Sequence, residues 1–236
     1  MTALAIRDCP SPNHDARPAG QPVDILLLHY TGMPSARDAL DRLVDPAAKV
    51  SAHYLIDEDG AVWRLVPEER RAWHAGLSSW AGERDINGRS IGIELVNPGH
   101  EFGYRPFPEE QMRALETLAR AILARHPIPA CRVLGHSDVA PLRKRDPGEL
   151  FDWARLARAG IGLWPEDEQA VGGPAADIAA LQAGLARYGY AVPRTGVLDD
   201  ETRAVVTAFQ RHFRPAKVDG VPDAGTAARL AALLSL

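Results

Sequence analysis

Continuous apolar runs in the first two thirds of the chain predict buried strands. Val23–Tyr30 (VDILLLHY) is bounded by turn residues, which suits a strand covered on both faces of a sheet. Ser90–Val96 (SIGIELV) predicts a second buried strand, and Arg132–Gly135 predicts a short one that ends at His136. Together these runs predict the strands of a buried sheet.

Helices and a hairpin are predicted between these strands. Ser35–Leu43 predicts a helix with its serine as the cap. The segments 50–56 and 61–66 flank a DEDG turn and predict a hairpin. Pro108–Arg125 predicts a helix with proline at its first position and apolar residues at the 3.6-residue period. Strands that alternate with helices, plus a hairpin, predict an α/β domain with a mixed central sheet flanked by helices.

The last quarter of the chain has a different pattern. Ile178–Tyr188 is amphipathic with the period of a helix. The motif G-V-x-D-x-x-T then occurs twice, at residues 196–202 and 220–226, each time ahead of a helical stretch. An N-cap aspartate satisfies free amides of a first helical turn, and a threonine three residues later is compatible with a reciprocal cap. The tail is therefore predicted to be a small all-α three-helix module.

Changes in composition divide the chain into four regions. Residues 1–22 contain four prolines and little periodicity, which predicts an extended leader outside the core. Residues 23–164 form the predicted α/β domain. Residues 165–176 are acidic, rich in glycine and proline and aperiodic, as linkers are. Residues 177–236 form the predicted helical module.

The composition of the chain argues against several classes of protein. Of the 236 residues, 46% are hydrophobic and 25% are charged, which disfavours wholesale disorder, a collagen-like repeat and a coiled-coil rod. A net charge of -4 gives no electrostatic reason to expect nucleic acid as a partner. The two cysteines, Cys9 and Cys131, do not suggest a disulfide framework. Histidines number eight, more than the five tyrosines.

The N-terminal region carries no apolar run of the kind that a secretory signal needs, because Met1–Ile6 meets Arg7-Asp8 too early. Elsewhere the apolar runs fall short of the roughly 18 residues that span a bilayer. We therefore expect a cytoplasmic protein without a membrane span. A truncated N-terminus is the alternative, and it would allow a periplasmic or lipid-anchored protein. The sequence carries no signal for an oligomeric state.

Three residues at strand ends suggest a metal site. A catalytic zinc site needs three protein ligands and an open position, and two histidines with one carboxylate are an established set. His29 ends the first buried strand, His136 follows the last one, and Asp146 comes ten residues later. Taken alone, a histidine at a strand end is more often a hydrogen-bonded core residue, and Asp146-Pro147-Gly148 is also typical of a turn. These residues by themselves leave both interpretations open.

The motifs around these residues resemble those of a known family. LLLHYTG, GHSDVAP and KRDPG resemble the type-2 zinc N-acetylmuramoyl-L-alanine amidases. This family includes the bacterial anhydro-muropeptide amidases and shares its fold with phage amidase lysozymes and peptidoglycan recognition proteins. SAHYLID (51–57), RAWHAG (71–76) and SIGIEL (90–95) match the family in the same order. The tail is similar to the small helical peptidoglycan-binding domain that some of these amidases carry at the C-terminus.

The resemblance implies a zinc amidase catalytic domain with a specific set of site residues. By resemblance, His29, His136 and Asp146 bind one Zn²⁺ per chain, Glu94 is the catalytic glutamate and Lys144 the catalytic lysine. Amide hydrolysis needs an activated water, a stabiliser of the oxyanion and a proton for the departing amine. The zinc ion would activate the water and polarise the lactyl carbonyl. Glu94 would carry the proton to the L-alanine nitrogen, and Lys144 would hold the oxyanion.

Further histidines and an aromatic residue lie in the same motifs. We expect either His53 or His74 to contact the ligands or the substrate, with packing in the core as the alternative for each. Trp73 offers a stacking face for a sugar ring, although an aromatic residue at such a position is also typical of the core. The other four histidines are expected at the surface: His14, His100, His126 and His212.

Substrate recognition is expected to use a guanidinium group, because the stem peptide of peptidoglycan carries several carboxylates. Arg84, Asn87 and Arg89 lie just upstream of SIGIEL, where the family places peptide-binding groups. Asp85 departs from the family pattern, which often has a basic residue there. The alternative for this segment is a solvated loop.

The resemblance implies that the protein hydrolyses the amide between the lactyl group of N-acetylmuramic acid, or of its 1,6-anhydro form, and the L-alanine of the stem peptide. Muropeptides or peptidoglycan would be its substrates, in the recycling or turnover of the bacterial cell wall. A non-catalytic peptidoglycan recognition protein is one alternative, although such proteins generally lack a metal ligand. A zinc peptidase acting on the stem peptide is another.

Overall fold

The computed structural model describes residues 5–165 and 177–236. Most of the predicted linker, residues 166–176, lies outside the described residues, as does the start of the predicted leader. Within the described part, no helix is long and apolar enough to cross a membrane.

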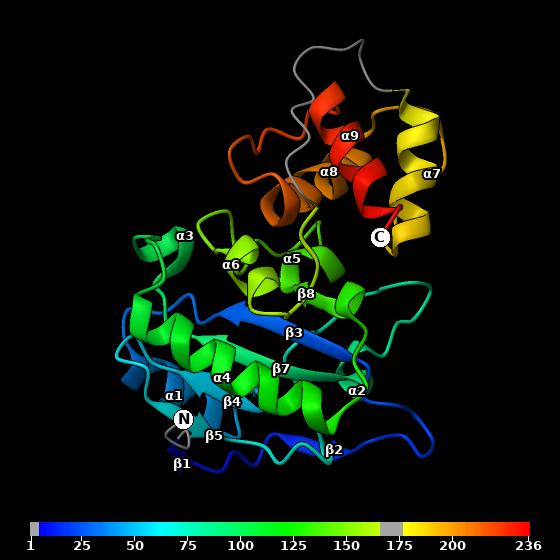
Figure 1. Ribbon diagram of the computed structural model, residues 1–236. Coiled ribbons are helices and arrows are strands. Elements are labelled where there is room, and N and C mark those ends of the chain that lie inside the picture. The colour runs from blue at the N-terminus through cyan, green and yellow to red at the C-terminus, as the bar shows by residue number, and fades with distance from the viewer. Residues whose placement is uncertain (1–4, 166–176) are drawn as a thin grey trace.

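A six-stranded mixed sheet forms the centre of the larger unit (Figure 1). Its strands, in spatial order, are β1 (Ile6–Asp8), β5 (Val62–Arg64), β4 (Tyr54–Ile56), β7 (Ser90–Leu95), β3 (Ile25–Tyr30) and β8 (Val133–Gly135). Strand β3 pairs in parallel with both β7 and β8, whereas β4 and β5 form the predicted antiparallel hairpin. The mixed α/β sheet predicted from the apolar runs is confirmed.

The helices alternate with the strands along the chain and, in space, pack around the sheet. They are α1 (Ala36–Val44), α2 (Ile86–Arg89), α3 (Gly99–Phe102), α4 (Glu109–Arg125), α5 (His136–Val139), α6 (Trp153–Arg158), α7 (Ile178–Tyr188), α8 (Asp200–Phe213) and α9 (Ala224–Leu233), with a 3-10 turn at Ala130–Arg132. Ser35 caps α1 as predicted, through a bond from the Asp38 amide to its hydroxyl. Pro108 occupies the N-cap of α4, one position before the predicted one.

The region predicted as a leader contributes two short strands. β1 extends the sheet at one edge, and β2 (His14–Ala16) pairs with β6 (Arg70–Ala72) in a separate ribbon. Between them the buried side chain of Asn13 donates hydrogen bonds to the carbonyls of Asp45 and Val50. Because strands this short lack a hydrophobic pattern of their own, only their distant partners identify them.

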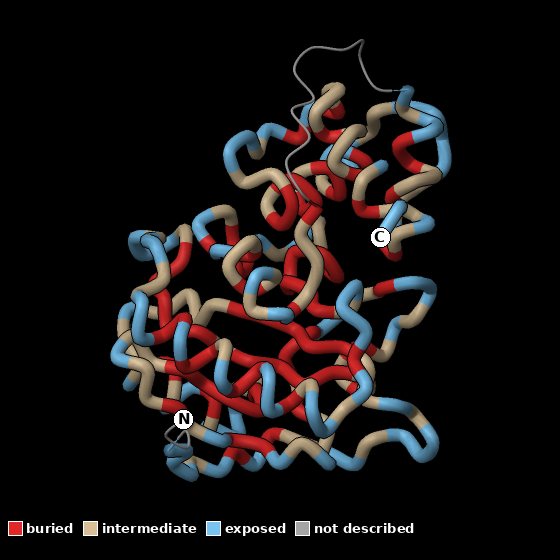
Figure 2. The backbone as a smooth tube through the Cα atoms, in the orientation of Figure 1, coloured by how far each residue is buried: buried red, intermediate tan, exposed pale blue. Residues whose placement is uncertain are grey.

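The two faces of the sheet are covered by different elements. One face packs under α4, where Leu26 and Leu28 meet apolar residues such as Leu115. On the opposite face Leu55 packs against α1, and Leu27 packs into a core shared with the C-terminal helices. Figure 2 shows the buried backbone concentrated in these strands. Between α1 and the C-terminal helices this second face carries polar residues.

The C-terminal helices repeat one arrangement. Asp199 and Asp223 cap α8 and α9 by accepting from the amides of Thr202 and Thr226, as the repeated motif predicts. Gln182, which is buried, donates to Thr202 Oγ1 at 2.8 Å, and a second buried glutamine makes the equivalent bond to Thr226 Oγ1. The predicted small helical region is confirmed.

Candidate metal centre and active site

Backbone register places the central side chains of the site. In the parallel pairing of β3 with β7, His29 lies opposite Glu94. In the pairing of β3 with β8, Leu28 lies opposite Gly135, so His136 comes next to His29 where β8 ends. Paired residues point to the same face of a sheet, about 5 Å apart. Glu94, His29 and His136 therefore form a row on the face opposite α4.

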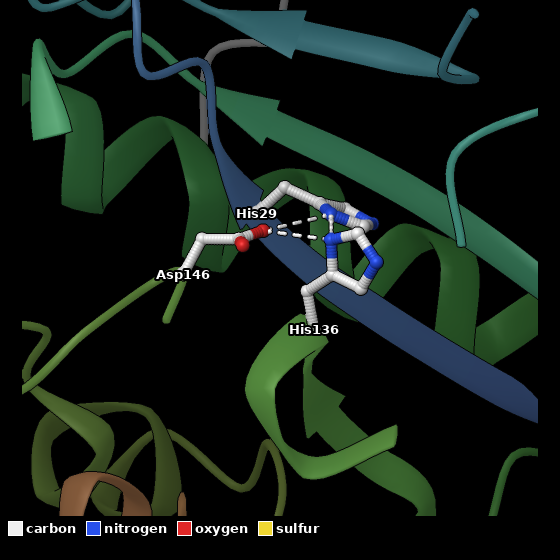
Figure 3. Close-up of side chains that lie close together, drawn as sticks. All are labelled: His29, His136 and Asp146. Carbon is white, nitrogen blue, oxygen red and sulfur yellow. Dashed lines mark hydrogen bonds and ion pairs between the residues drawn. The ribbon is translucent and has the colours of Figure 1, made fainter. Parts of the chain in front are cut away.

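The three predicted ligands converge. His29 Nδ1 lies 2.9 Å from His136 Nδ1, and both nitrogens lie 3.0 Å from Asp146 Oδ2. Figure 3 shows the three side chains pointing at one another from β3, from the start of α5 and from the loop that follows. All three are buried, and within the described residues they form a group able to hold a metal ion.

In both His29 and His136, the ring nitrogen that faces away from Asp146 makes a hydrogen bond, and these bonds fix the tautomer of each ring. Ser90 Oγ donates to the carbonyl of Ile86, so it accepts from His74 Nε2 at 3.2 Å. His74 Nδ1 is then an acceptor, and it takes the proton of His29 Nε2 at 3.0 Å. His136 Nε2 lies 3.0 Å from the carbonyl of Ala75, to which it must donate. Both His29 and His136 therefore turn an unprotonated Nδ1 toward Asp146.

This donor set fits a divalent metal ion. Two imidazole lone pairs and a carboxylate oxygen face one another with no proton among them, an arrangement that is repulsive unless a cation lies between. In a tetrahedral zinc site with bonds of about 2.0–2.2 Å the ligand atoms lie about 3.3 Å apart. The separations of 2.9–3.0 Å found here are close to that value.

The electrostatics favour the protonation states that a metal requires. Burial, reinforced by the neighbouring His136, lowers the pKa of His29 to about 4 and keeps its ring neutral. Metal ligands bind as neutral imidazole and ionised carboxylate. The site is therefore ready to bind a cation at neutral pH.

Glu94 and Lys144 face the same small cavity. This cavity, of about 180 Å³, is lined by both residues together with His136 and Asp146. Glu94 Oε2 is buried and has no hydrogen-bond partner among the residues that the structure describes. Burial and the Asp146 carboxylate raise the pKa of Glu94 well above its usual value, against a smaller opposing effect of Lys144. A carboxyl with a raised pKa beside a metal site is suited to accept and return a proton.

A larger groove opens next to this cavity. Its volume is about 750 Å³, and Tyr30, Lys144 and Asp146 line both spaces. Arg42 reaches the groove from α1, and Arg145 reaches it from the loop after α5 that also carries Asp146. Neither of these exposed guanidinium groups has a hydrogen-bond or ion-pair partner among the described residues, so both are free to meet an anionic ligand.

The remaining predicted residues lie in different surroundings. His74 contacts His29 and lines the small cavity. His53 is enclosed: its Nδ1 accepts from the Gly92 amide, and its Nε2 lies 3.0 Å from a guanidinium nitrogen of the half-buried Arg17. Trp73 is half-buried and lines neither space. Arg84 is exposed away from both.

Three sequence expectations change in detail. Asn87 supports the backbone, because its Oδ1 accepts from the amides of His74 and Ala75. Arg89 pairs with Asp24 and does not line the groove. The expectation that His212 lies at the surface is wrong, since it is 3% exposed.

Sequence reasoning missed three residues of the site. Ser90 opens the SIGIEL motif, but its bond to His74 depends on a contact that no local pattern reveals. Arg145 stands inside the KRDPG motif, which could have pointed to it. Arg42 carried no signal, because a basic residue in the last turn of a helix is common on solvated surfaces.

Comparison with known proteins gives two family matches. A family model described as "N-acetylmuramoyl-L-alanine amidase" matches residues 19–149, and one described as "Putative peptidoglycan binding domain" matches residues 174–230. The N-acetylmuramoyl-L-alanine amidase AmiD of Escherichia coli (strain K12) is 41% identical over 231 residues, covering 90% of this chain and 82% of the relative. The 1,6-anhydro-N-acetylmuramyl-L-alanine amidase AmpD of the same organism is 37% identical over 170 residues, covering 65% of this chain and 91% of the relative.

Solved structures show the same fold. A complex of E. coli AmiD with the substrate anhydro-N-acetylmuramic acid-L-Ala-D-gamma-Glu-L-Lys matches with a TM-score of 0.83 and 40% identity, over 92% of this chain and 91% of that one. AmpDh3 from Pseudomonas aeruginosa, in complex with an anhydromuramic pentapeptide, matches with a TM-score of 0.80 and 37% identity, over 91% and 92% of the two chains. Both matches extend through the C-terminal helices as well as the sheet.

Proposed function

We propose a mechanism and a substrate on the premise that this chain belongs to the N-acetylmuramoyl-L-alanine amidase family. The enzyme is a hydrolase that cleaves the amide between the lactyl group of N-acetylmuramic acid and L-alanine. We assign one Zn²⁺ per chain to His29, His136 and Asp146. The observation that carries this assignment is the convergence of two unprotonated Nδ1 atoms and one carboxylate oxygen in line with Glu94.

The chain's own groups supply the proton transfers. When bound, Zn²⁺ lowers the pKa of its water to about 7 and polarises a carbonyl oxygen. Glu94, whose buried Oε2 has no partner within residues 5–165 and 177–236, accepts the proton of the attacking water and passes it to the L-alanine nitrogen as the amide bond breaks. Lys144 lines the same cavity and places its ammonium group beside the oxygen that becomes negative.

The groove accommodates the rest of a muropeptide. The solved complexes of related enzymes contain anhydro-muramyl peptides, and we extend that substrate class, including the 1,6-anhydro sugar, to this enzyme. Arg42 and Arg145 line the groove without an ion-pair partner in the described part of the chain, and we assign to them the carboxylates of the stem peptide. They take the role that the sequence suggested for Arg84 and Asn87. His53 and Trp73, which line neither space, are not assigned a substrate contact.

Product analysis tests the reaction. Incubating the enzyme with a purified anhydro-muropeptide should release a peptide that begins with L-alanine, identified by mass spectrometry. A zinc peptidase would instead cut inside the peptide, and a non-catalytic recognition protein would leave the substrate intact. The complete ligand set favours the amidase over the recognition protein.

Substitution of the proton carrier tests the mechanism. Glu94→Gln should lower kcat by about 10²–10⁴-fold, because general acid–base catalysis contributes that much, while the protein retains its zinc. Full activity in Glu94→Gln would overturn the assignment of this residue. Metal analysis of the purified enzyme, and loss of cleavage on chelation, test the zinc assignment separately.

We also propose that residues 23–164 are the catalytic domain and that residues 177–236, joined to it by 165–176, act as a peptidoglycan-binding domain. Pull-down of the full chain with insoluble peptidoglycan, against a variant that lacks residues 177–236, would test the second assignment. The cytoplasmic location expected from the sequence stays a prediction, and fractionation of cells that express the gene from its native start would test it.

A further inference from the structure

The C-terminal helices share a core with the catalytic unit. One continuous apolar cluster joins Leu27 of β3 and Val139 of α5 to Val205 and Phe209 of α8. Figure 1 shows α8 adjacent to α5, and the two helices are in contact. A module that served only to bind the wall would not need such a core. This contact therefore calls for an account beyond wall binding.

The buried carboxylate of Asp138 links the two units. Asp138 follows the predicted metal ligand His136 by two positions in the chain. Asp138, which is 1% exposed, accepts from the Gly135 amide at 2.8 Å. It also accepts from the hydroxyl of Tyr190 at 2.6 Å and lies 2.7 Å from His212 Nδ1. Because a carboxylate can only accept, His212 Nδ1 must be the donor. Two of the three bonds to Asp138 thus come from the C-terminal helical unit.

His212 is held in the orientation that this bond requires. Its ring stacks on Trp153 with centroids 3.7 Å apart and an angle of 18° between the planes. The ring is 3% exposed, so water cannot readily replace it as the partner of Asp138. Loss of this donor would leave a buried carboxylate with one bond fewer, and the short helix α5 would then be free to shift.

α8 makes a second contact on the C-terminal side of Asp146, in the loop that carries this residue. Arg211 Nε lies 3.6 Å from a carboxylate oxygen of Glu149, three residues after Asp146. The same carboxylate lies 3.1 Å from His100 Nε2, and His100 Nδ1 lies 2.9 Å from the hydroxyl of Tyr30. This chain of contacts ends on the residue that follows His29 in β3. Neighbouring residues of α8 thus reach both ends of the loop.

We propose that α8 holds the segment 135–149 in its metal-binding geometry, with His212 as the positioning residue. This segment carries His136, Lys144 and Asp146, and it has little regular structure of its own. The C-terminal unit therefore completes the metal centre in addition to any role in binding the wall. This inference rests on the proposed function, because it concerns the ligands assigned there.

The test compares the metal affinity of full-length variants. His212→Phe keeps the stack on Trp153 but removes the donor to Asp138. Loss of an outer contact to a metal site typically costs 10- to 100-fold in affinity, and we expect about tenfold weaker Zn²⁺ binding in competition with a chromophoric chelator. The visible absorption of the Co²⁺-loaded variant should also shift, because the ligand geometry changes. Tyr190→Phe, which removes the second donor, should weaken binding to a smaller extent.

Two further variants separate positioning from stability. His212→Asn restores an N–H donor near the position of Nδ1 and should recover most of the affinity. Val206→Ala is the matched control, because Val206 is buried in the shared core of the same helix. It should lower the midpoint of urea unfolding while leaving Zn²⁺ affinity and the Co²⁺ spectrum unchanged.

Unchanged Zn²⁺ affinity and Co²⁺ spectrum in His212→Phe would overturn the inference. Equal loss of affinity in Val206→Ala would also overturn it, since the effect would then come from global stability. Failure of the proposed function looks different, because the wild-type protein itself would bind no zinc or release no peptide. Wild-type binding and cleavage with no effect of His212→Phe would refute the positioning role alone.

Discussion

The contact between His74 and His29 should set the metal affinity of the site. His29 Nε2 is buried and donates to His74 Nδ1, which keeps the other ring nitrogen unprotonated for the metal. Replacing His74 by leucine, a side chain of similar volume, removes the acceptor. The metal-free protein can avoid an unpartnered His29 N–H by moving the proton to Nδ1. Metal binding requires Nδ1 unprotonated, so the metal-bound state alone must leave the N–H of Nε2 without a partner.

The size of the penalty follows from the burial. Leaving a buried donor unsatisfied costs about 1–3 kcal/mol. Because each 1.4 kcal/mol is a factor of ten in an equilibrium constant, His74→Leu should weaken Zn²⁺ binding by about 5- to 150-fold. Ser90→Ala removes the partner of His74 and not a direct partner of His29, and it adds no volume. It should therefore weaken Zn²⁺ binding less than His74→Leu does. His74→Asn places an amide oxygen near the position of Nδ1 and should retain most of the affinity.

Equilibrium competition with a chromophoric chelator measures these affinities, and circular dichroism of the metal-free proteins checks that each variant folds. His14→Leu is the matched control, because His14 lies on β2 and lines neither space of the site. If folded His74→Leu bound Zn²⁺ as tightly as the wild type, the tautomer argument would be wrong. The same conclusion would follow if His74→Asn lost as much affinity as His74→Leu.

Three more predictions concern neighbouring positions. In Gly92→Ala the new Cβ would lie 2.6 Å from ring atoms of His74, so the variant should unfold at lower urea and bind Zn²⁺ more weakly; wild-type metal affinity would contradict this. Arg42→Met should raise KM about tenfold with kcat nearly unchanged, because the interaction with a distant carboxylate is the same in ground and transition states; a lower kcat at constant KM would contradict it. For Glu68, burial raises the pKa, but hydrogen bonds from an arginine, a tyrosine and a histidine outweigh it and lower the pKa to about 2. Because this pKa is depressed, ionised Glu68 stabilises the fold above about pH 4.5, and the contribution is lost as the pH falls toward 2. Urea unfolding should therefore show Glu68→Gln about 2 kcal/mol less stable than the wild type at pH 6 and nearly as stable as the wild type at pH 2. A stability difference that does not change with pH would refute this linkage.

The strands of the site could be predicted because they are continuous apolar runs. In Ile25–Tyr30 and Ser90–Leu95 burial on both faces shows directly in the sequence. The position of His29 at a strand end suggested a metal ligand, whereas the role of Glu94 was predicted from the resemblance to the amidase family. The residues that hydrogen-bond to the histidines from the side facing away from the metal could not be predicted in this way. The bond between His29 and His74 joins residues 45 positions apart, and nothing local distinguishes it from core packing.

The burial of His212 was missed although a signal existed. Val205, Ala208 and Phe209 are buried on one stripe of α8, and His212 occupies the next position of the same helical period. A histidine on an apolar stripe needs a partner. That partner, Asp138, lies 74 residues earlier in the chain, so the pattern could indicate burial but not the contact.

The two halves of the proposed metal centre are held by different physical means. Parallel pairing of β3 with β7 fixes His29 beside Glu94 through backbone hydrogen bonds, so their spacing needs no support from side chains. His136 and Asp146 lie on a mostly irregular segment, where one backbone bond from the Ser137 amide to the Asp146 carbonyl joins them. Segments with so few repeating bonds open at low free-energy cost. The geometry of this half must therefore come from contacts made by distant parts of the chain, which is why a helix from the C-terminal unit can determine how well the site binds its metal.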